Sequence, residues 1–235
     1  MDHQGLSVVI GARGGIGAAL LERLRAASAP GSVIGLSRSS LPALDLLDED
    51  SIAASAREIE AITRTQGLEL VRVIDATGVL HDGRLQPERG LKELDGDHLA
   101  RVFAINAIGP ALVMKHFLPL LPRRGRSVFA TLSARVGSIS DNRLGGWYGY
   151  RASKAALNQL VRTAAIELAR RKPDAICVAL HPGTVATPLS APFVKSGLEL
   201  RSPQRAAEEL MAVIDGLGVS DSGGFLDHHG VRIPY

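Results

Sequence analysis

The chain has 235 residues, of which 46% are hydrophobic and 22% charged, so it can bury a large core and is not predicted to be disordered. Its formal net charge of +3 is not gathered in a long basic block, which disfavours nucleic acid as a partner. Its single cysteine cannot form an internal disulfide, and no apolar stretch approaches the roughly 18 residues of a membrane span. We therefore expect a soluble cytoplasmic protein with no membrane partner.

Short apolar runs alternate with longer segments of helical period along the chain. The predicted strands are residues 7–10, 32–36, 71–76, 127–132, 176–180 and 224–226. The predicted helices are residues 15–27, 49–64, 94–121, 148–170 and 203–217. Strands that are apolar on both faces and separated by helices are typical of a parallel sheet covered on each side. The predicted fold class is α/β, a Rossmann-type doubly wound parallel sheet in three α/β/α layers, with residues 1–235 in a single domain.

Two segments depart from this alternation. A short strand at residues 43–46 would follow Leu36 after only about six residues, whereas a parallel crossover takes about a dozen or more. We therefore predict one crossover without a helix. Further on, Pro188, Pro192 and Gly197 make residues 187–202 a poor regular element, and we predict a flexible substrate flap there.

The first predicted strand runs directly into a glycine-rich loop and then a helix. The loop residues that we expect to bind a cofactor are Gly11, Arg13, Gly14, Gly15, Ile16 and Gly17. Glycine permits a tight turn and a close approach of the main chain to a pyrophosphate, whose negative charge is favoured at a helix N-terminus. Such a loop can be a purely structural turn. At the first strand-to-helix junction of a doubly wound fold, however, it predicts a dinucleotide site.

The residues after the second predicted strand bear on the choice of cofactor. Ser37 and Arg38 stand there, and no carboxylate follows until Asp45. A carboxylate at this position would bind the ribose hydroxyls of NAD, whereas an arginine pairs with a 2′-phosphate. With Arg13 as a second cation on the same side, we favour NADP(H) over NAD. The alternative for Arg38 is a solvated loop residue.

Tyr150 and Lys154 lie four residues apart in a predicted helix, so both side chains share one face. Carbonyl reduction needs an acid that protonates the developing alkoxide, and alcohol oxidation needs the corresponding base. A free phenol titrates at about 10, and a neighbouring cation favours its ionised form. The same spacing also occurs by chance as an exposed pair. Here it predicts hydride transfer to a carbonyl, or from a secondary alcohol, of a small molecule, with Tyr150 as the acid or base.

The spacing Gly11-x-x-x-Gly15-x-Gly17, together with Tyr150-x-x-x-Lys154, resembles the short-chain dehydrogenase/reductase family over nearly the whole chain. Residues 133–158, and the ending Ile233-Pro234-Tyr235, resemble its C-factor-like and sniffer-type carbonyl reductase branch. The resemblance implies NADPH-dependent carbonyl reduction by a homodimer or homotetramer.

The resemblance also implies roles for residues outside the glycine loop. Asn106 matches a helix asparagine that disturbs its helix and holds a water of the proton relay, and Lys154 grips the nicotinamide ribose. Asp45 and Leu46 match a pair that contacts adenine, while Asp75-Ala76-Thr77-Gly78 is a partial match to Asn-Asn-Ala-Gly. The cofactor-binding residues that it implies are Asp45, Leu46, Ala76, Thr77, Gly78, Asn106, Tyr150, Lys154, Pro182, Gly183, Val185 and Thr187.

The catalytic serine departs from the pattern of the resemblance. Most relatives have two serines in a row after the strand that precedes Tyr150 and use the second, but here Ala134 follows Ser133. A serine would donate a hydrogen bond to the substrate oxygen, and we choose Ser133 for this role, with Ser138 as the alternative. The departure leaves open a cofactor-binding regulatory or signalling protein with little turnover. A nucleotide-binding scaffold without nicotinamide fits Tyr150, Lys154 and Asn106 poorly.

No metal site is predicted. His228 and His229 have only Asp227 beside them at ligand spacing, and His181, at the end of an apolar run, is interpreted as structural.

Overall fold

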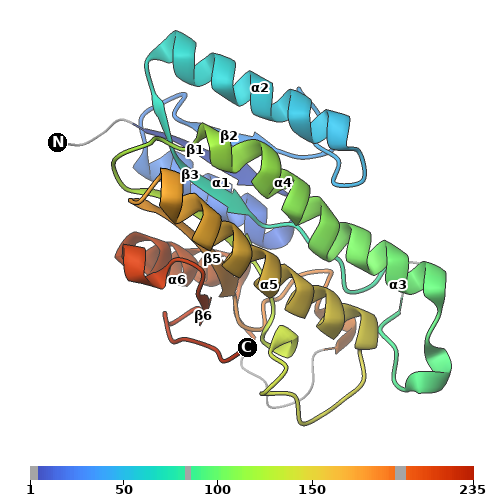
Figure 1. The fold of residues 1–235 in the computed structure, drawn as a ribbon. Helices are drawn as coiled ribbons and strands as arrows, with labels where there is room; N and C mark the ends of the chain where they lie inside the picture. The colour runs from blue at the N-terminus through green and yellow to red at the C-terminus, as the bar shows by residue number, and fades with distance from the viewer. Residues whose placement is uncertain (1–4, 83–85, 194–199) are drawn as a thin grey trace.

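The computed structural model describes residues 5–82, 86–193 and 200–235. A parallel sheet forms its centre, with the strand order β2-β1-β3-β4-β5-β6 (Figure 1). The strands are β1 (Gly5–Ile10), β2 (Val33–Leu36), β3 (Glu69–Asp75), β4 (Ser127–Leu132), β5 (Ala175–His181) and β6 (Phe225–Asp227). Every ladder between neighbouring strands is parallel. The predicted Rossmann-type α/β class is confirmed.

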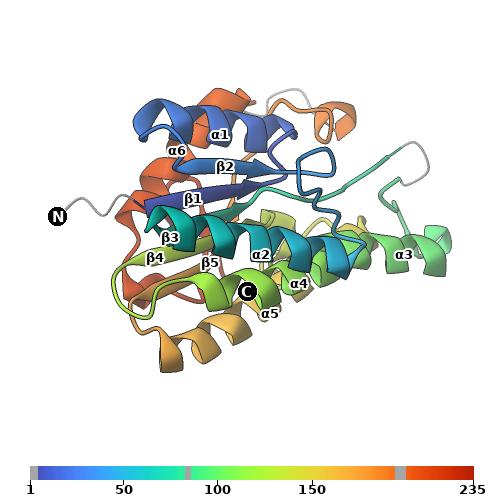
Figure 2. The same cartoon turned by 90° about the horizontal axis from the view of Figure 1, so that it is seen from above.

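Helices cover both faces of the sheet. They are α1 (Gly15–Ala27), α2 (Glu49–Gln66), α3 (Gly96–Phe103), α4 (Gly109–Phe117), α5 (Tyr148–Arg171) and α6 (Pro203–Gly216). Helices α1 and α6 pack on one face, and α2, α4 and α5 cover the other (Figure 2). The alternation of sequence patterns therefore predicted the three layers correctly.

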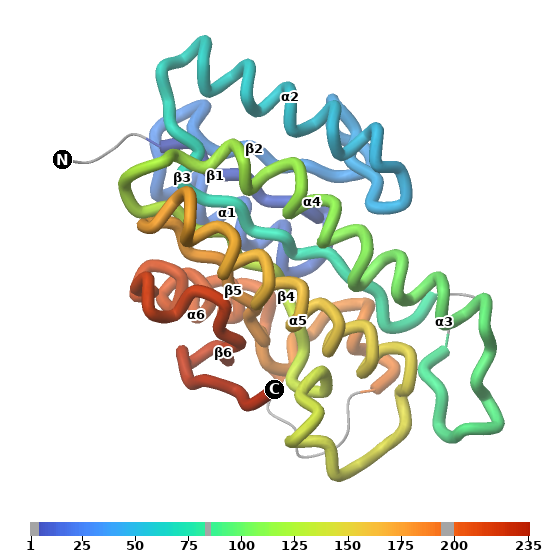
Figure 3. Tube along the Cα trace, viewed as in Figure 1, coloured from blue at the N-terminus to red at the C-terminus, as the bar shows by residue number. Residues whose placement is uncertain are grey.

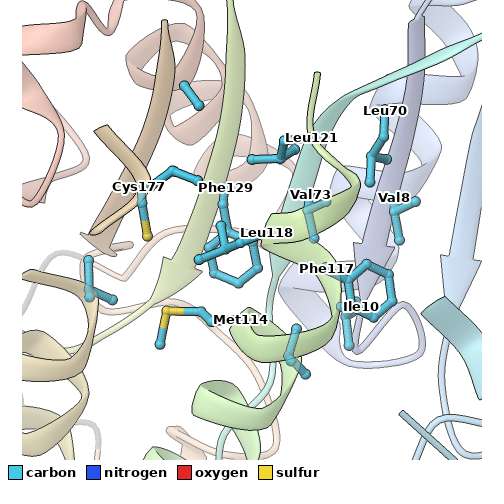
Figure 4. Close-up of a cluster of buried hydrophobic side chains, with 14 of the residues drawn as sticks. Val8, Ile10, Leu70, Val73, Met114, Phe117, Leu118, Leu121, Phe129 and Cys177 are labelled. Carbon is cyan, nitrogen blue, oxygen red and sulfur yellow. The ribbon is translucent and has the colours of Figure 1, made fainter. Parts of the chain in front are cut away.

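Successive side chains of each strand pack into the core layers on opposite faces of the sheet. In β1, Val8 and Ile10 pack toward α4 with Phe117, whereas Val9 faces the layer of α1 and α6 (Figure 4). Because side chains alternate across a strand, an apolar run without polar breaks requires helices on both sides. The single cysteine, Cys177, is buried in the α4–α5 layer, and burial raises the pKa of its thiol to about 12.

The predicted strand at residues 43–46 is absent, and the prediction of a crossover without a helix is wrong. The Leu44 N–H donates to the Ser37 carbonyl (2.9 Å), and the Ala43 carbonyl accepts from Ser55 Oγ on α2 (3.3 Å). These main-chain groups are thus satisfied by the preceding turn and by α2, so they do not extend the sheet. Residues 37–48 lead into α2, and the crossover from β2 to β3 carries that helix.

The predicted helix at residues 94–121 is a composite. It consists of α3, a π-helical turn at Ala104–Ile108, α4 and a short 3-10 turn at Leu118–Leu120. By length and composition alone, Gly96–Leu120 could cross a membrane, although the prediction from the sequence was that no segment could. Buried core helices pass the same test, and here Val102, Val113 and Phe117 are buried in the fold.

Candidate active site

The glycine loop joins β1 to α1 at the carboxyl edge of the sheet. A Cβ atom on Gly17 would lie 2.2 Å from the Gly11 carbonyl oxygen, and one on Gly15 would lie 2.6 Å from Thr187 Cγ2. Gly11 has φ +79°, a left-handed conformation that favours glycine. Gly14 is the N-cap residue of α1 and provides no side-chain acceptor. The loop therefore leaves the first N–H groups of α1 to an anion from outside the chain.

The strand order reverses beside this loop, because the chain passes from β1 outward to β2 and returns to β3. A Cβ on Gly11 would lie 3.1 Å from the main chain of Ala76 and from Thr77 Cγ2. The Ala76 N–H in turn donates to the Ile10 carbonyl (2.9 Å). The connections after β3, β4 and β5 emerge on the same side of the molecule (Figure 3). Ligands of open α/β sheets bind at such a switch point.

The two cations proposed for a 2′-phosphate, Arg13 and Arg38, are exposed beside the glycine loop and the turn after β2. Arg13 Nη1 donates to Ser39 Oγ (3.2 Å), and Ser37 Oγ lies 3.3 Å from Ser39 Oγ. Arg38, between the two serines, is also exposed. The structure thus brings Arg13 from the glycine loop against the turn that follows β2.

Asp45 and Leu46 lie in the turn before α2. The Asp45 Oδ1 atom accepts the Leu47 N–H (3.0 Å), so one carboxylate oxygen shapes its own turn. Leu46 packs so closely on Gly109 that a Cβ there would lie 2.7 Å from Leu46 Cβ. The contact with adenine remains a prediction for this pair.

Tyr150 and Lys154 lie in the first two turns of α5, on one face as expected. Lys154 is 3% exposed, and its Nζ donates to the Leu132 carbonyl at the end of β4 (2.8 Å). Burial raises the pKa of Tyr150 to about 12. Burial also lowers the pKa of Lys154 to about 8, against the opposing charge of Asp75. The low-polarity surroundings keep the phenol neutral and bring the ammonium close to titration.

Asp75 is a fully buried carboxylate at the end of β3. Its Oδ1 accepts the N–H (3.1 Å) and the Oγ1 hydroxyl (2.6 Å) of Thr77, and its Oδ2 accepts from Thr131 Oγ1 (2.9 Å). Three donors of this kind compensate for the burial of the charge. This acid, which stands where the family pattern has an asparagine, is held in place by these hydrogen bonds and acts against the lowering of the Lys154 pKa.

Asn106 lies in the π-helical turn, so the predicted disturbance of the helix is present. Its Oδ1 accepts the Val79 N–H and its Nδ2 donates to the Val79 carbonyl, both at 2.8 Å. Nδ2 also donates to Ser153 Oγ on α5 (3.2 Å). A Cβ on Gly78 would lie 3.4 Å from both Asn106 Oδ1 and Lys154 Nζ. Asn106, Lys154 and Gly78 therefore converge, as the predicted site requires.

The two candidate serines have different surroundings. Ser133 is 4% exposed, and its Oγ donates to Asn158 Oδ1 within the fold (2.7 Å). Ser138 is 1% exposed, and its Oγ accepts the Asp141 N–H (3.2 Å). To donate a hydrogen bond to a substrate, the Ser133 hydroxyl would have to give up its hydrogen bond to Asn158. The Ser138 hydroxyl only accepts a hydrogen bond from the Asp141 N–H, so its own proton is still available.

The segment after β5 reaches the glycine loop through Thr187. Gly183 has φ +76°, and a Cβ there would lie 3.1 Å from Arg201 Nη1. Val185 forms an isolated parallel bridge with Arg201, which fixes the path of the chain after Pro182. The predicted nicotinamide-side residues thus lie on one continuous segment beside Gly15. Part of the predicted flap, residues 194–199, lies outside the described residues.

The histidines at this edge are not arranged as metal ligands. Burial lowers the pKa of His181 to about 4, so the ring is neutral, and it packs 6.3 Å from His228. Within residues 5–82, 86–193 and 200–235, no group of three or more potential metal ligands is found.

Sequence reasoning missed an aromatic group beside Tyr150. The Trp147 ring lies 6.2 Å from Tyr150 and 5.2 Å from Phe193, and Phe193 lies 5.4 Å from His81. His81 Nε2 also lies 3.0 Å from the Pro188 carbonyl oxygen. These rings come from segments far apart in the chain, so no local pattern marks them as a group.

Glu88 was missed as well. This side chain is 2% exposed and contacts the start of α5. In the sequence it is a single acid in a loop, which is the usual pattern of a solvated surface residue.

Comparisons with known proteins identify the class. A family model described as "Enoyl-(Acyl carrier protein) reductase" matches residues 3–213. The chain belongs to the short-chain dehydrogenase/reductase family of oxidoreductases. It is 38% identical over 145 residues to C-signal of Myxococcus xanthus, covering 62% of this chain and 83% of that protein. It is 34% identical over 195 residues to 1-hydroxy-2-glutathionyl-2-methyl-3-butene dehydrogenase of Rhodococcus sp., covering 83% and 79%.

Solved structures agree with this assignment. NADPH-bound carbonyl reductase from chicken fatty liver has a TM-score of 0.83 at 25% identity, covering 98% of each chain. The carbonyl reductase Sniffer of Drosophila melanogaster has a TM-score of 0.81 at 23% identity, covering 98% of this chain and 100% of that one, and shows the same fold. The likenesses to C-signal and to the chicken carbonyl reductase support the C-factor-like and sniffer-type branch.

Proposed function

We propose that this protein reduces the carbonyl group of a small molecule, or oxidises the corresponding alcohol, with NADP(H). The observation that carries the proposal is that Lys154 and Asn106 meet at Gly78, which directly follows the residues packed against Gly11, with Tyr150 one turn before Lys154 on α5. When bound, the nicotinamide supplies or accepts the hydride. Gly11, Gly15 and Gly17 pack too tightly against the protein to carry side chains, and the N-terminus of α1 that follows them has no side-chain cap, so its N–H groups would bind the pyrophosphate.

In this proposal Tyr150 gives its proton to the oxygen of the reduced carbonyl. Burial raises the pKa of the phenol to about 12, so the proton is available at neutral pH. The Lys154 ammonium, supported by Asp75, favours the phenolate that is left behind.

The proposed preference for NADP(H) over NAD rests on Arg13 and Arg38. Arg13 lies against the turn at Ser37 and Ser39, Arg38 is exposed in that turn, and β2 ends without a carboxylate. The likeness to an NADPH-bound carbonyl reductase supports the same choice. The remaining proposed cofactor contacts are Ile16, Asp45, Leu46, Ala76, Thr77, Pro182, Gly183, Val185 and Thr187.

A regulatory protein that binds the cofactor but turns over little substrate is the second candidate. Two observations favour it: Ala134 occupies the usual serine position, and the Ser133 hydroxyl is engaged with Asn158. The likeness to C-signal is compatible with it.

We further propose a single cytoplasmic domain, with residues 187–202 as the substrate flap, that assembles as a homodimer or homotetramer. Helices α4 and α5 would supply the contact between subunits. Between them lies a groove of about 820 Å³ lined in part by Met114, Leu118, Leu160 and Leu168. This groove lies along the second half of α5, away from Tyr150.

The function is tested by following NADPH absorbance with 2,3-butanedione, benzaldehyde and other small carbonyl compounds. We expect turnover by the native protein, and Tyr150→Phe should lower kcat about 10²- to 10⁴-fold while NADPH still binds, because only the phenolic proton is lost. A purified protein that binds NADPH but reduces none of the panel would favour the regulatory candidate.

A further inference from the structure

Glu88 is a buried acid outside the predicted site that contacts the helix of Tyr150. The side chain is 2% exposed, in the loop between β3 and α3. Its Oε2 accepts the Gly149 N–H (3.1 Å), and its main-chain carbonyl accepts the Trp147 N–H (2.5 Å). Its Oε1 is buried without a hydrogen-bond partner among the described residues. Glu88 therefore accepts two N–H groups at the start of α5, those of the N-cap residue Trp147 and of Gly149.

The start of α5 needs such support because its backbone is unusual. Gly145, Gly146 and Trp147 have φ values of +65°, +65° and +54°. Among the described residues, Trp147 is the only non-glycine residue with positive φ, and its side chain makes no capping hydrogen bond. A bulky side chain in this region is strained and persists only where its surroundings hold it. A carboxylate at a helix N-terminus also interacts favourably with the helix dipole.

The contact leaves no space for a side chain at Gly149, where a Cβ would lie 2.9 Å from Glu88 Oε1 and 3.2 Å from Leu99 Cδ2. The carboxylate is thus packed against the main chain one residue before Tyr150. On the other side, the Trp147 ring lies 6.2 Å from the Tyr150 ring at an interplanar angle of 74°. Trp147 therefore connects Glu88 to the ring of Tyr150.

We propose that Glu88 is a positioning residue for Tyr150. By holding the N–H groups of Trp147 and Gly149, it keeps Trp147 left-handed and its ring against the phenol. Its side chain is buried against the start of α5, so it would act through Trp147 and Tyr150 rather than directly on the reacting atoms. Its effect on turnover rests on the proposed function, whereas its effect on Trp147 does not.

The test compares Glu88→Asp with Glu88→Gln in the full chain. Aspartate keeps the charge but is one methylene shorter, whereas glutamine keeps an oxygen at the same reach for the Gly149 N–H. Glu88→Asp should lower kcat about 10- to 100-fold with the KM for NADPH within about twofold, because the phenol is misplaced. Glu88→Gln should stay within about threefold of the native kcat.

Trp147 is the single tryptophan of the chain, so intrinsic fluorescence reports its surroundings directly. Glu88→Asp should shift its emission to longer wavelength, and Glu88→Gln should not. Glu93→Gln is the matched control, because this exposed carboxylate of the same region accepts the Arg89 N–H (2.8 Å) and should change neither property.

A native kcat in Glu88→Asp together with a lowered kcat in Glu88→Gln would overturn the proposal. The charge of the side chain, rather than its length, would then matter. An unchanged emission in Glu88→Asp would overturn the proposal as well. If the native protein reduces no carbonyl, the proposed function fails, and the fluorescence of the same variants still decides whether Glu88 holds Trp147.

Discussion

Around the glycine loop, the atoms that set the geometry belong mainly to the main chain, whereas around Tyr150 they belong to side chains from distant segments. Gly17 lies against the carbonyl of Gly11, six residues earlier, and the uncapped N-terminus of α1 follows directly. Beside Tyr150, by contrast, Glu88 and Phe193 come from loops about 60 and 40 residues away in sequence. The cofactor half of the site, around the glycine loop, can thus be predicted from local sequence. The substrate half, around Tyr150, depends on contacts that the whole fold brings together.

The difference has a physical reason. A dinucleotide offers the same pyrophosphate to every protein that binds it, and glycines with a helix N-terminus suffice to accommodate it. A substrate pocket must match one molecule, so its side chains can vary without disturbing the sheet.

The largest effect expected in the substrate half concerns the two serines. If one of them donates to the substrate oxygen, its replacement by alanine should lower kcat about 10²- to 10³-fold, and the other should have little effect. Ser138 has the freer hydroxyl, because Ser133 Oγ donates to Asn158. The measurement is kcat of Ser133→Ala and Ser138→Ala on the best carbonyl substrate.

Stability separates the two variants further. Ser133→Ala leaves the buried Asn158 amide without this partner, and this should cost about 1–3 kcal/mol of unfolding free energy. Full activity in both variants would show that neither serine serves the substrate.

In the cofactor half, Gly17→Ala is the addition of a single methyl group that should weaken NADPH binding most. Its Cβ would lie 2.2 Å from the Gly11 carbonyl oxygen, so the loop must move, and about 1–3 kcal/mol of strain would weaken NADPH binding about 10- to 100-fold. Gly96→Ala is the matched control at the start of α3, where a Cβ would meet nothing within 4 Å. NADPH titration of both variants is the measurement, and equal affinities would contradict the reason given for Gly17.

Arg38→Asp should have a smaller and more selective effect. Loss of one charge-assisted contact should weaken NADPH about tenfold, and the new carboxylate should strengthen NADH, since it can accept from the ribose hydroxyls. Arg64→Asp, at an exposed position of α2, is the control for the change of charge. If neither cofactor's affinity changes, Arg38 does not bind the 2′-phosphate.

The smallest effect is a pH dependence. Because the pKa of Lys154 is lowered to about 8, its ammonium is lost as the pH rises through that value, and the rate of carbonyl reduction should fall. Between the folded pKa near 8 and the ordinary 10.5, the unfolded chain holds the extra proton, so unfolding free energy should rise with pH. Lys154→Arg keeps the cation and should move the break in kcat/KM upward. If the break in the pH profile of kcat/KM stays near pH 8 in Lys154→Arg, it reports the titration of another group.

Much of this structure follows from the sequence, and the failures have local causes. The runs at residues 7–10 and 127–132 became strands because apolar residues without polar breaks need cover on both faces. The predicted strand at residues 43–46 was wrong because the Ser37 carbonyl and the Ser55 hydroxyl bind the main chain of this segment, and no sequence pattern reveals those contacts. Asn106 was recognised through the resemblance. Glu88 was not, because only the folded chain shows that its side chain is buried against the start of α5.

The proposed hydride transfer is tested most directly with a labelled cofactor. The native protein is given NADPH carrying deuterium at the transferable position of the nicotinamide, together with a carbonyl substrate, and the alcohol product is analysed by mass spectrometry. We expect one deuterium on the carbinol carbon of the product of the native protein, and Tyr150→Phe should form this product about 10²- to 10⁴-fold more slowly. Reduction without transfer of deuterium, or full activity in the Tyr150→Phe variant, would contradict the proposed function.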